Sequence, residues 1–182
     1  FNVFNALCVI ALCDKLNLGC ESVYNSLLSF NGVKRRFEHL GKMNNAEVIH
    51  DYAHHPTEIN KVINAFRGYY DDELVVVFQP HTYSRTKDLM SGFVKVLSSN
   101  LIDEVVLLPT YPAREKPSAG YNAKQLCDNV SKHKKQCYYL SRTKAKKYLY
   151  KKSLSKNIAF LILGAGDIET FARSLVNKIT NN

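Results

Sequence analysis

The chain has 182 residues, which fits one ordinary domain with room for part of a second. Hydrophobic residues make up 46% of it and charged residues 23%, a composition that excludes an intrinsically disordered chain. The five cysteines form no CxxC pair or Cys/His cluster with zinc spacing, so we expect a reduced, cytoplasmic protein. There is no signal peptide or apolar run of membrane-spanning length, so we expect no membrane partner.

The net charge of +9 is concentrated in one stretch. Ten Lys and Arg residues, with no acid among them, lie between Lys132 and Lys156. This run could be a solvated surface, could attract an anionic small substrate, or could bind nucleic acid. Because no zinc finger, RNA-recognition signature or glycine–aromatic interleaving accompanies it, we favour the solvated surface and expect no nucleic-acid partner.

The first 36 residues are predicted to be helical. An apolar stretch from Asn2 to Asn17 indicates one helix that stops at Gly19, and a second helix is expected from Glu21 to Phe30. The first of these helices has no N-cap of its own, which is typical of a helix inside a larger protein. We therefore predict that residues 1–36 are the last helices of a neighbouring domain and that residues 37–182 form a second domain.

Strands and helices alternate through that second domain. Strands are expected at residues 37–42, 47–50, 74–78, 105–108, 137–140 and 158–163. Helices are expected at residues 56–70, 85–98 and 122–132, in the basic stretch after residue 140, and over a last segment that buries Ile168 through Ile179. This order predicts an α/β fold with a mainly parallel sheet flanked by helices.

Polar residues gather in four loops, each of which follows a predicted strand: residues 51–56, 79–85, 109–117 and 164–167. Ligands of open α/β sheets bind outside the carboxyl ends of the strands, so all four loops should line one site. Three of the six histidines, His54, His55 and His81, fall in these loops.

Each of these residues has a structural and a functional interpretation. His54 and His55 could cap a helix, and no partner with metal-ligand spacing favours a metal site. Asp51 could cap a turn or accept hydrogen bonds from a ribose. Arg85 stands in the first turn of a predicted helix, where the helix dipole disfavours a cation, so an anionic ligand would explain it.

The glycines and the paired arginines are also ambiguous. Gly164 and Gly166 lack the third glycine of a dinucleotide fingerprint, and close backbone approach is the better explanation for them. No G-x-x-x-x-G-K-[ST] phosphate-binding loop occurs in the sequence. Arg35 and Arg36, at the predicted domain joint, could be solvated or could meet a ligand.

Six segments in chain order resemble motifs of the Mur ligases. They are NVFNAL (residues 2–7), FNGVKRRF (30–37), DYAHHPTE (51–58), FQPHTYSRT (78–86), YPAREKP (111–117) and GAGDI (164–168). Phe1 departs from the pattern, because the family usually has His there. The resemblance extends to about Arg173, which is nearly the whole chain.

The resemblance implies a three-domain enzyme with a UDP-binding domain, a central ATPase domain and a Rossmann-like C-terminal domain. It implies a reaction that uses ATP and Mg²⁺ to phosphorylate the carboxylate of UDP-N-acetylmuramate, after which an amino acid, here L-alanine, attacks the acyl phosphate. By position, Asn2 and Asn5 would contact adenine, Arg36 the terminal phosphate and Asp51 the ribose. Tyr52, His54, His81 and Arg85 would surround the amino acid and the reacting carboxyl group, and His55 belongs to the same substrate-binding motif. Catalysis would fall to Arg36, His54, His81 and Arg85.

In this interpretation the phosphate-binding lysine and the metal ligands belong to the central domain. We therefore expect this chain alone to bind no metal, to hold no ATP tightly and to be inactive. Two alternatives stay open: a non-catalytic binding module, and the related ligase that attaches recycled murein peptides. The stretch from Gln79 to Thr86 favours the alanine-adding enzyme over that relative.

Overall fold

The structure is a computed structural model that describes residues 2–30, 32–116, 121–134 and 136–176. Expectations that involve Phe1, Asn31, Pro117, Lys135 or Ile179 lie outside the described residues. The chain divides into two compact units: unit 1 is Phe1–Val33 and unit 2 is Lys34–Asn182. The division falls three residues before the boundary expected from the sequence.

Unit 1 consists of two helices, α1 (Asn2–Lys15) and α2 (Cys20–Leu28). The prediction that α2 continues to Phe30 was wrong. The helix ends at Leu28, Ser29 is its C-cap and donates its side-chain hydroxyl to the Ser26 carbonyl, and Phe30 is 63% exposed. No described residue of this unit is buried.

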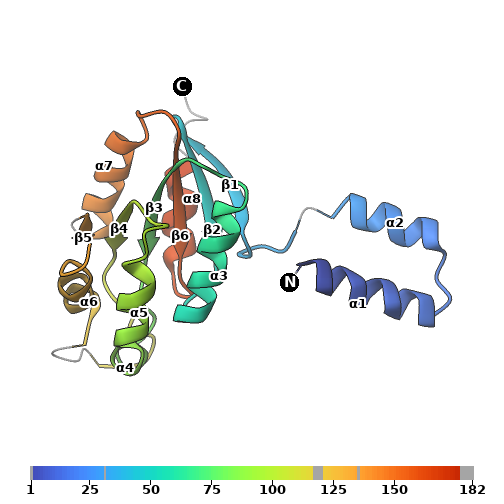
Figure 1. Cartoon of the computed structure of the whole chain (residues 1–182), viewed down its shortest axis with the longest axis horizontal. Helices are drawn as coiled ribbons and strands as arrows, with labels where there is room; N and C mark the ends of the chain where they lie inside the picture. Colours follow the sequence, from blue (N-terminus) through green and yellow to red (C-terminus); the bar gives the residue numbers. More distant parts are fainter. Residues whose placement is uncertain (1, 31, 117–120, 135, 177–182) are drawn as a thin grey trace. The chain divides into compact units, whose positions relative to one another are not determined.

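Unit 2 is built on a six-stranded sheet in the order β1-β2-β6-β3-β4-β5 (Figure 1). Its strands are β1 (Glu38–Met43), β2 (Ala46–Asp51), β3 (Glu73–Phe78), β4 (Glu104–Leu107), β5 (Cys137–Tyr139) and β6 (Ile158–Leu163). β1 pairs antiparallel with β2, and all the other neighbouring strands are parallel. The predicted mainly parallel sheet with flanking helices is therefore confirmed.

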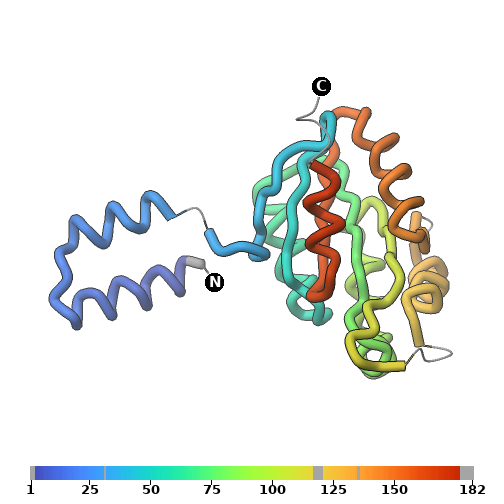
Figure 2. Tube along the Cα trace, turned by 180° about the vertical axis from the view of Figure 1, so that it is seen from behind, coloured from blue at the N-terminus to red at the C-terminus, as the bar shows by residue number. Residues whose placement is uncertain are grey.

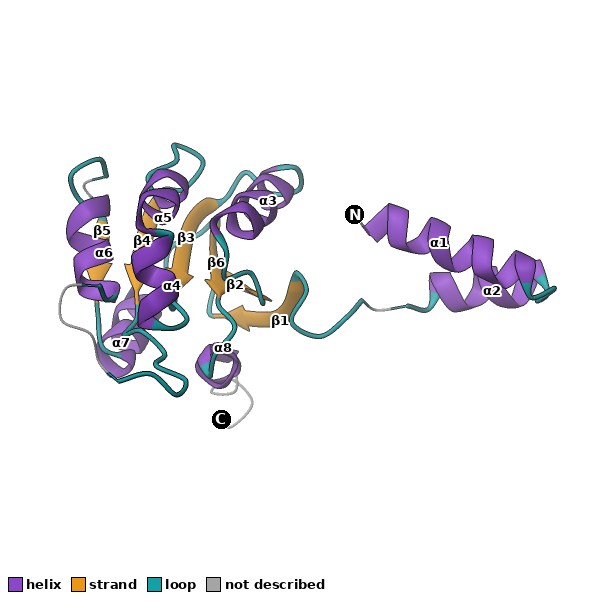
Figure 3. Cartoon of the chain, turned by 90° about the horizontal axis from the view of Figure 1, so that it is seen from below, coloured by secondary structure: helices purple, strands orange, loops and turns teal. Residues whose placement is uncertain are grey.

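Helices cover both faces of the sheet (Figure 3). One face carries α3 (Pro56–Arg67), α5 (Met90–Leu97) and α6 (Ala123–Val130), and the other carries α7 (Arg142–Lys152) and α8 (Ile168–Val176). In β3, Leu74, Val76 and Phe78 point into the first core and Val75 and Val77 into the second, all fully buried. Burial on both faces explains why this strand is an unbroken apolar run.

The helix predicted over residues 85–98 is in fact two helices, α4 (Tyr83–Asp88) and α5. Leu89 caps both of them, with φ −108° and ψ 14°, outside the α-helical region. The expectation of one helix was wrong because the apolar spacing continues through Leu89 although the backbone turns there. The break leaves α4, with Arg85, directly beside the carboxyl end of β3.

The basic stretch forms helix α7, and several of its cations have partners inside the protein. Lys152 pairs with the buried Glu104, Arg142 pairs with Asp167, and the Lys146 amino group donates to the Ser174 carbonyl at 2.7 Å. The helix thus joins the second face of the sheet through polar contacts as well as through its apolar residues. None of the described helices is long and apolar enough to cross a membrane.

Candidate functional site at the carboxyl edge of the sheet

The four polar loops leave the sheet at one edge, as predicted. Asp51 at the end of β2 and Phe78 at the end of β3 are both in register with Leu163 at the end of β6. Leu107 at the end of β4 is in register with Phe78, so the four strands end level with one another. The loops that follow therefore lie side by side over the same edge.

Four rings from three of these loops form a row above that edge. The Tyr52 and His54 ring centroids are 5.3 Å apart, those of His54 and His81 6.1 Å, and those of His81 and Tyr111 5.4 Å. We call Tyr52, His54, His81 and Tyr111 the ring row. It brings together residues that are up to 59 positions apart in the sequence.

The turn after β6 leaves room for the ring row because it has no side chains at two positions. A Cβ on Gly166 would lie 2.6 Å from the Tyr111 ring. A Cβ on Gly164, whose φ is +148°, would lie 3.0 Å from the Gln79 carbonyl oxygen. Both glycines therefore provide close backbone approach, the interpretation favoured from the sequence.

Three arginines of the segments at this edge, Arg36, Arg85 and the exposed Arg114, have no carboxylate within ion-pairing distance among the described residues. Arg36 is exposed, and its guanidinium carbon is 5.9 Å from the Tyr52 ring centroid. Arg85 is half-buried in α4 and lies close enough to His81 to lower the pKa of that ring. Arg35, Arg67, Arg142 and Arg173 all form ion pairs. Unpaired guanidinium groups are suited to an anionic ligand.

The two histidines of the ring row differ in their environment. Burial, with a further contribution from the Arg85 charge, lowers the pKa of His81 and favours its neutral form. Its Nδ1 atom is buried and has no hydrogen-bond partner among the described residues. His54 is held more firmly, because its Nδ1 lies 3.1 Å from the Tyr52 carbonyl oxygen and 3.4 Å from a Glu58 carboxylate oxygen.

His55 and Asp51 have structural partners. His55 is the N-cap of α3: its ring nitrogen accepts from the Thr57 N–H at 3.2 Å, and Glu58 completes a capping box. Asp51 is 2% exposed, and its two carboxylate oxygens accept from the Ala53 and Phe37 N–H groups at 2.7 and 2.8 Å. The ribose role of Asp51 stays a prediction, and any such contact would use the remaining lone pairs of the carboxylate.

No role was predicted for Glu115, although it lies in one of the four loops. Its carboxylate accepts from the Tyr83 and Ser84 N–H groups at 2.6 and 3.0 Å and from the Ser84 hydroxyl. These bonds lower the pKa of Glu115 and fix the start of α4. Thr82, the N-cap of α4, has a positive φ of 63°, which is unusual for a β-branched residue and persists only where surrounding contacts hold it.

The remaining predicted ligands lie in unit 1. Asn2 and Asn5 belong to α1, and Asn5 is exposed; their contacts with adenine stay predictions. Among the described residues, no group of three or more His, Cys, Asp or Glu side chains could hold a metal ion.

Unit 2 is thus a Rossmann-like domain whose polar loops and unpaired arginines gather at one edge of the sheet, an arrangement suited to an anionic ligand. A family model described as the Mur ligase glutamate ligase domain matches residues 35–166. The UDP-N-acetylmuramate–L-alanine ligase of Agathobacter rectalis is 40% identical over 182 aligned residues, covering 97% of this chain and 38% of that protein. The ligase of the same name from Lachnospira eligens is 39% identical, covering 96% of this chain and 38% of that protein.

A solved structure agrees with these relatives. The UDP-N-acetylmuramate–alanine ligase of Thermotoga maritima superposes with a TM-score of 0.76 at 35% identity, covering 97% of this chain and 37% of that one. The chain belongs to the Mur ligase family, in its glutamate ligase domain. It spans a little over a third of the length of the relatives that it matches.

Proposed function

We propose that this chain is the C-terminal part of an ATP-dependent ligase that joins L-alanine to UDP-N-acetylmuramate in the cytoplasm, a step of peptidoglycan synthesis. The observation that carries the proposal is the ring row with Arg36 and Arg85 beside it, at the carboxyl edge of the sheet. The similarity to the alanine-adding ligases of Agathobacter and Lachnospira supports the choice of substrates.

The two arginines are suited to negative charge at different points of the site. Arg36 is exposed at the start of unit 2, where its planar guanidinium can hold a terminal phosphate of ATP through two parallel hydrogen bonds. Arg85 lies beside His81, where it can hold a carboxylate or stabilise the oxyanion of the tetrahedral intermediate. Positioning and charge stabilisation are most of what phosphoryl transfer requires of a protein.

The lowered pKa of His81 favours a second role for that residue. L-alanine enters with a protonated amino group, which must lose a proton before its nitrogen can attack the acyl phosphate. A neutral imidazole at pH 7 can accept that proton, whereas a protonated one cannot. The new C–N bond then forms, the C–O bond to phosphate breaks, and phosphate leaves with its electron pair and takes up the second proton that the nitrogen loses on becoming an amide.

The residues of this chain would meet the nucleotide at its adenine, ribose and terminal phosphate, through Asn2, Asn5, Asp51 and Arg36. When bound, Mg²⁺ would screen the phosphate charge, and its ligands would come from the central domain. We therefore expect the 182-residue chain alone to bind ATP weakly and to be inactive.

The test is a phosphate-release assay on the full-length protein with UDP-N-acetylmuramate, ATP and an amino acid or peptide. We expect release with L-alanine and none with the murein tripeptide L-Ala-γ-D-Glu-meso-diaminopimelate. Faster release with the tripeptide would identify the peptide-recycling ligase instead. No release with either substrate would favour a non-catalytic binding module. Release by the 182-residue chain alone would contradict the assignment of the phosphate-binding groups to another domain.

A further inference from the structure

Arg35 and Arg36 are adjacent in the sequence but have opposite environments. The Arg36 side chain is exposed and has no carboxylate partner in the described part of the chain. Arg35 is half-buried, and its side chain contacts three separate elements of unit 2. The two arginines therefore differ in what they offer a ligand: the charge of Arg35 is already matched by the Glu169 carboxylate, whereas that of Arg36 is not.

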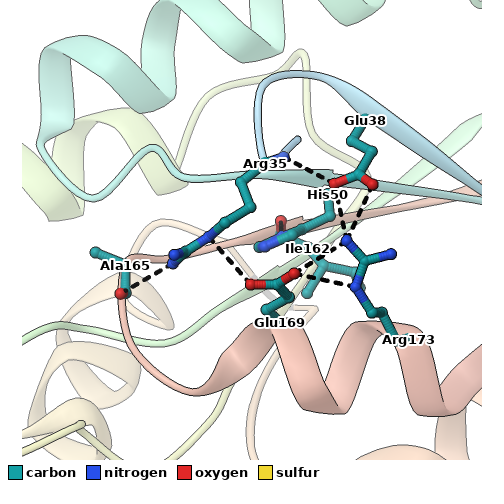
Figure 4. A network of polar contacts seen from close by, with 7 residues as sticks. All are labelled: Arg35, Glu38, His50, Ile162, Ala165, Glu169 and Arg173. Carbon is teal, nitrogen blue, oxygen red and sulfur yellow. Dashed lines mark hydrogen bonds and ion pairs between the residues drawn. The ribbon is translucent and has the colours of Figure 1, made fainter. Parts of the chain in front are cut away.

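The Arg35 side chain connects the start of unit 2 to the turn after β6 and to α8 (Figure 4). One terminal nitrogen donates to the Ala165 carbonyl oxygen at 3.1 Å, in the glycine turn after β6. Its Nε lies 3.3 Å from a Glu169 carboxylate oxygen in α8, an ion-pair distance without hydrogen-bond alignment. The guanidinium carbon is 4.4 Å from the Tyr52 ring centroid, so it also stacks on the first member of the ring row.

The backbone of the same segment is held at both ends. The Arg35 N–H donates to Glu38 at 2.7 Å, and the Arg35 carbonyl accepts from the Tyr52 N–H at 2.8 Å. Phe37 donates its N–H to Asp51 at 2.8 Å. Arg35 and Phe37 have positive φ values of 64° and 47°, which cost free energy for residues with a Cβ and persist only where surrounding contacts hold them.

Arg173 forms ion pairs with both acidic residues that contact Arg35. Arg173 in α8 pairs with Glu38 at 3.0 Å and with Glu169 at 2.9 Å, so both acidic partners of Arg35 are themselves fixed (Figure 4). His50 lies among these residues in Figure 4, fully buried, with its Nδ1 2.9 Å from the Ile162 carbonyl oxygen. α8 lies against β1 and β2 on the face of the sheet seen in Figure 2. We call Arg35, Glu38, Glu169 and Arg173 the clamp.

We propose that Arg35 is a positioning residue: through the clamp it fixes the segment that carries Arg36 and holds Asp51 and Tyr52 in place, while Arg36 is the arginine that meets the phosphate. The proposal deepens the proposed function and rests on it for its catalytic consequence. Its structural part, that Arg35 holds the segment and Tyr52 to the turn after β6 and to α8, stands independently.

The structural part is tested by amide hydrogen exchange on the 182-residue chain with Arg35→Met and the matched control Arg36→Met. The Phe37 and Tyr52 amides should exchange at least about tenfold faster in Arg35→Met. In that variant the segment can open locally without first breaking the contacts of the clamp, so opening costs less free energy. The Val76 amide in the central strand should change little, and Arg36→Met should leave all three unchanged. Arg35→Lys should give an intermediate result, since an ammonium can keep the Glu169 charge pair but cannot bridge Ala165 and Tyr52 as well.

Equal acceleration in the two Met variants, or none in Arg35→Met, would overturn the proposal. If Arg35→Met unfolds the chain, Glu169→Gln removes the charge of one clamp partner and should accelerate the same two amides to a smaller extent. No acceleration there would also count against it.

The catalytic part is tested in the full-length enzyme by separating kcat from KM for ATP. Arg36→Met should lower kcat by about a hundredfold or more, as loss of a charge contact in the transition state does, and Arg35→Lys should restore most of the activity lost in Arg35→Met. Arg36→Lys should not restore the activity lost in Arg36→Met, because a single ammonium lacks the two-point contact.

If the amide-exchange results hold but the wild-type enzyme shows no L-alanine-dependent turnover, the proposed function fails and the structural role of the clamp stands. If turnover is present but Arg36→Lys restores the activity lost in Arg36→Met, and Arg35→Lys does not restore that lost in Arg35→Met, the division of roles between the two arginines is wrong.

Discussion

The two units use their apolar residues in opposite ways. Unit 2 buries its large aliphatic and aromatic side chains in two cores, one on each face of the sheet. Unit 1 buries none in its described residues, and Phe4, Leu12 and Leu16 are 73%, 59% and 60% exposed. Two short helices cannot enclose a core by themselves, whereas a sheet between two helical layers can. Unit 2 should therefore be stable by itself, and unit 1 should need further protein to cover it.

The largest expected effect is that of core truncation in unit 2. Phe160 is fully buried in β6, so Phe160→Ala should lower the free energy of unfolding by about 3–5 kcal/mol. The matched change Phe4→Ala removes the same atoms from an exposed position and should alter it by no more than about 0.5 kcal/mol. Urea unfolding of both variants measures the difference. Similar losses in the two would contradict the contrast between the units.

The next effect concerns the buried charge pair between α7 and β4. Glu104 is 1% exposed and its carboxylate lies 2.9 Å from the Lys152 amino group. Lys152→Met would leave that carboxylate buried without its cation, at a cost of about 3 kcal/mol, the low end for such pairs because Lys152 is partly exposed. Lys151→Met, next to it and exposed, should cost close to nothing and serves as the control. Equal Tm values for the two variants would show that the pair is not formed.

A smaller effect is expected from pH. Burial lowers the pKa of His50 in the folded chain, so below about pH 6.5 the unfolded chain takes up a proton that the folded chain does not. The free energy of unfolding should therefore be level above pH 7 and should fall as the pH drops from 6.5 towards 5. His81, shifted in the same direction, adds to this slope. His50→Gln should reduce this dependence of the free energy of unfolding on pH. An unchanged dependence in that variant would show that other groups cause it.

The smallest effect should come from the largest change, removal of residues 1–33. Because the cores of unit 2 include no residue of unit 1, the midpoint of urea unfolding should stay almost the same. A peptide of residues 1–33 should show little helix by circular dichroism, since its helices of 14 and 9 residues are short for stability in isolation. A large loss of stability on truncation would mean that the two units form one cooperative structure.

The alternation of apolar strand segments and amphipathic helix segments along the sequence was enough to predict the sheet and the common edge of the four loops. Apolar runs such as residues 74–78 indicate strands buried on both faces, and the carboxyl ends of parallel strands meet at one edge whatever their order. The position of β6 between β2 and β3 depends on long-range pairing that local patterns do not contain. The break at Leu89 was missed for a related reason, since apolar spacing reports the buried face and not the backbone angles.

The site was partly predictable for similar reasons. His81 and Arg85 could be identified because polar residues interrupt an apolar pattern and match a family motif. The capping role of His55 was one of two interpretations until its ring was seen to accept from Thr57. The positioning role of Arg35 could not be predicted, because its partners Ala165 and Glu169 lie about 130 residues away in the sequence. Its positive φ could not be predicted either, because an arginine residue does not indicate that backbone conformation.

The central claim is that the carboxyl edge of unit 2 completes a ligase active site, and L-alanine-dependent phosphate release by full-length His81→Gln tests it most directly. Because the neutral His81 ring is assigned the proton of the amine, kcat should fall by about a hundredfold or more. The matched control His39→Gln changes an exposed histidine of β1 and should leave turnover unchanged. Equal turnover by His81→Gln and the wild-type enzyme would contradict the account.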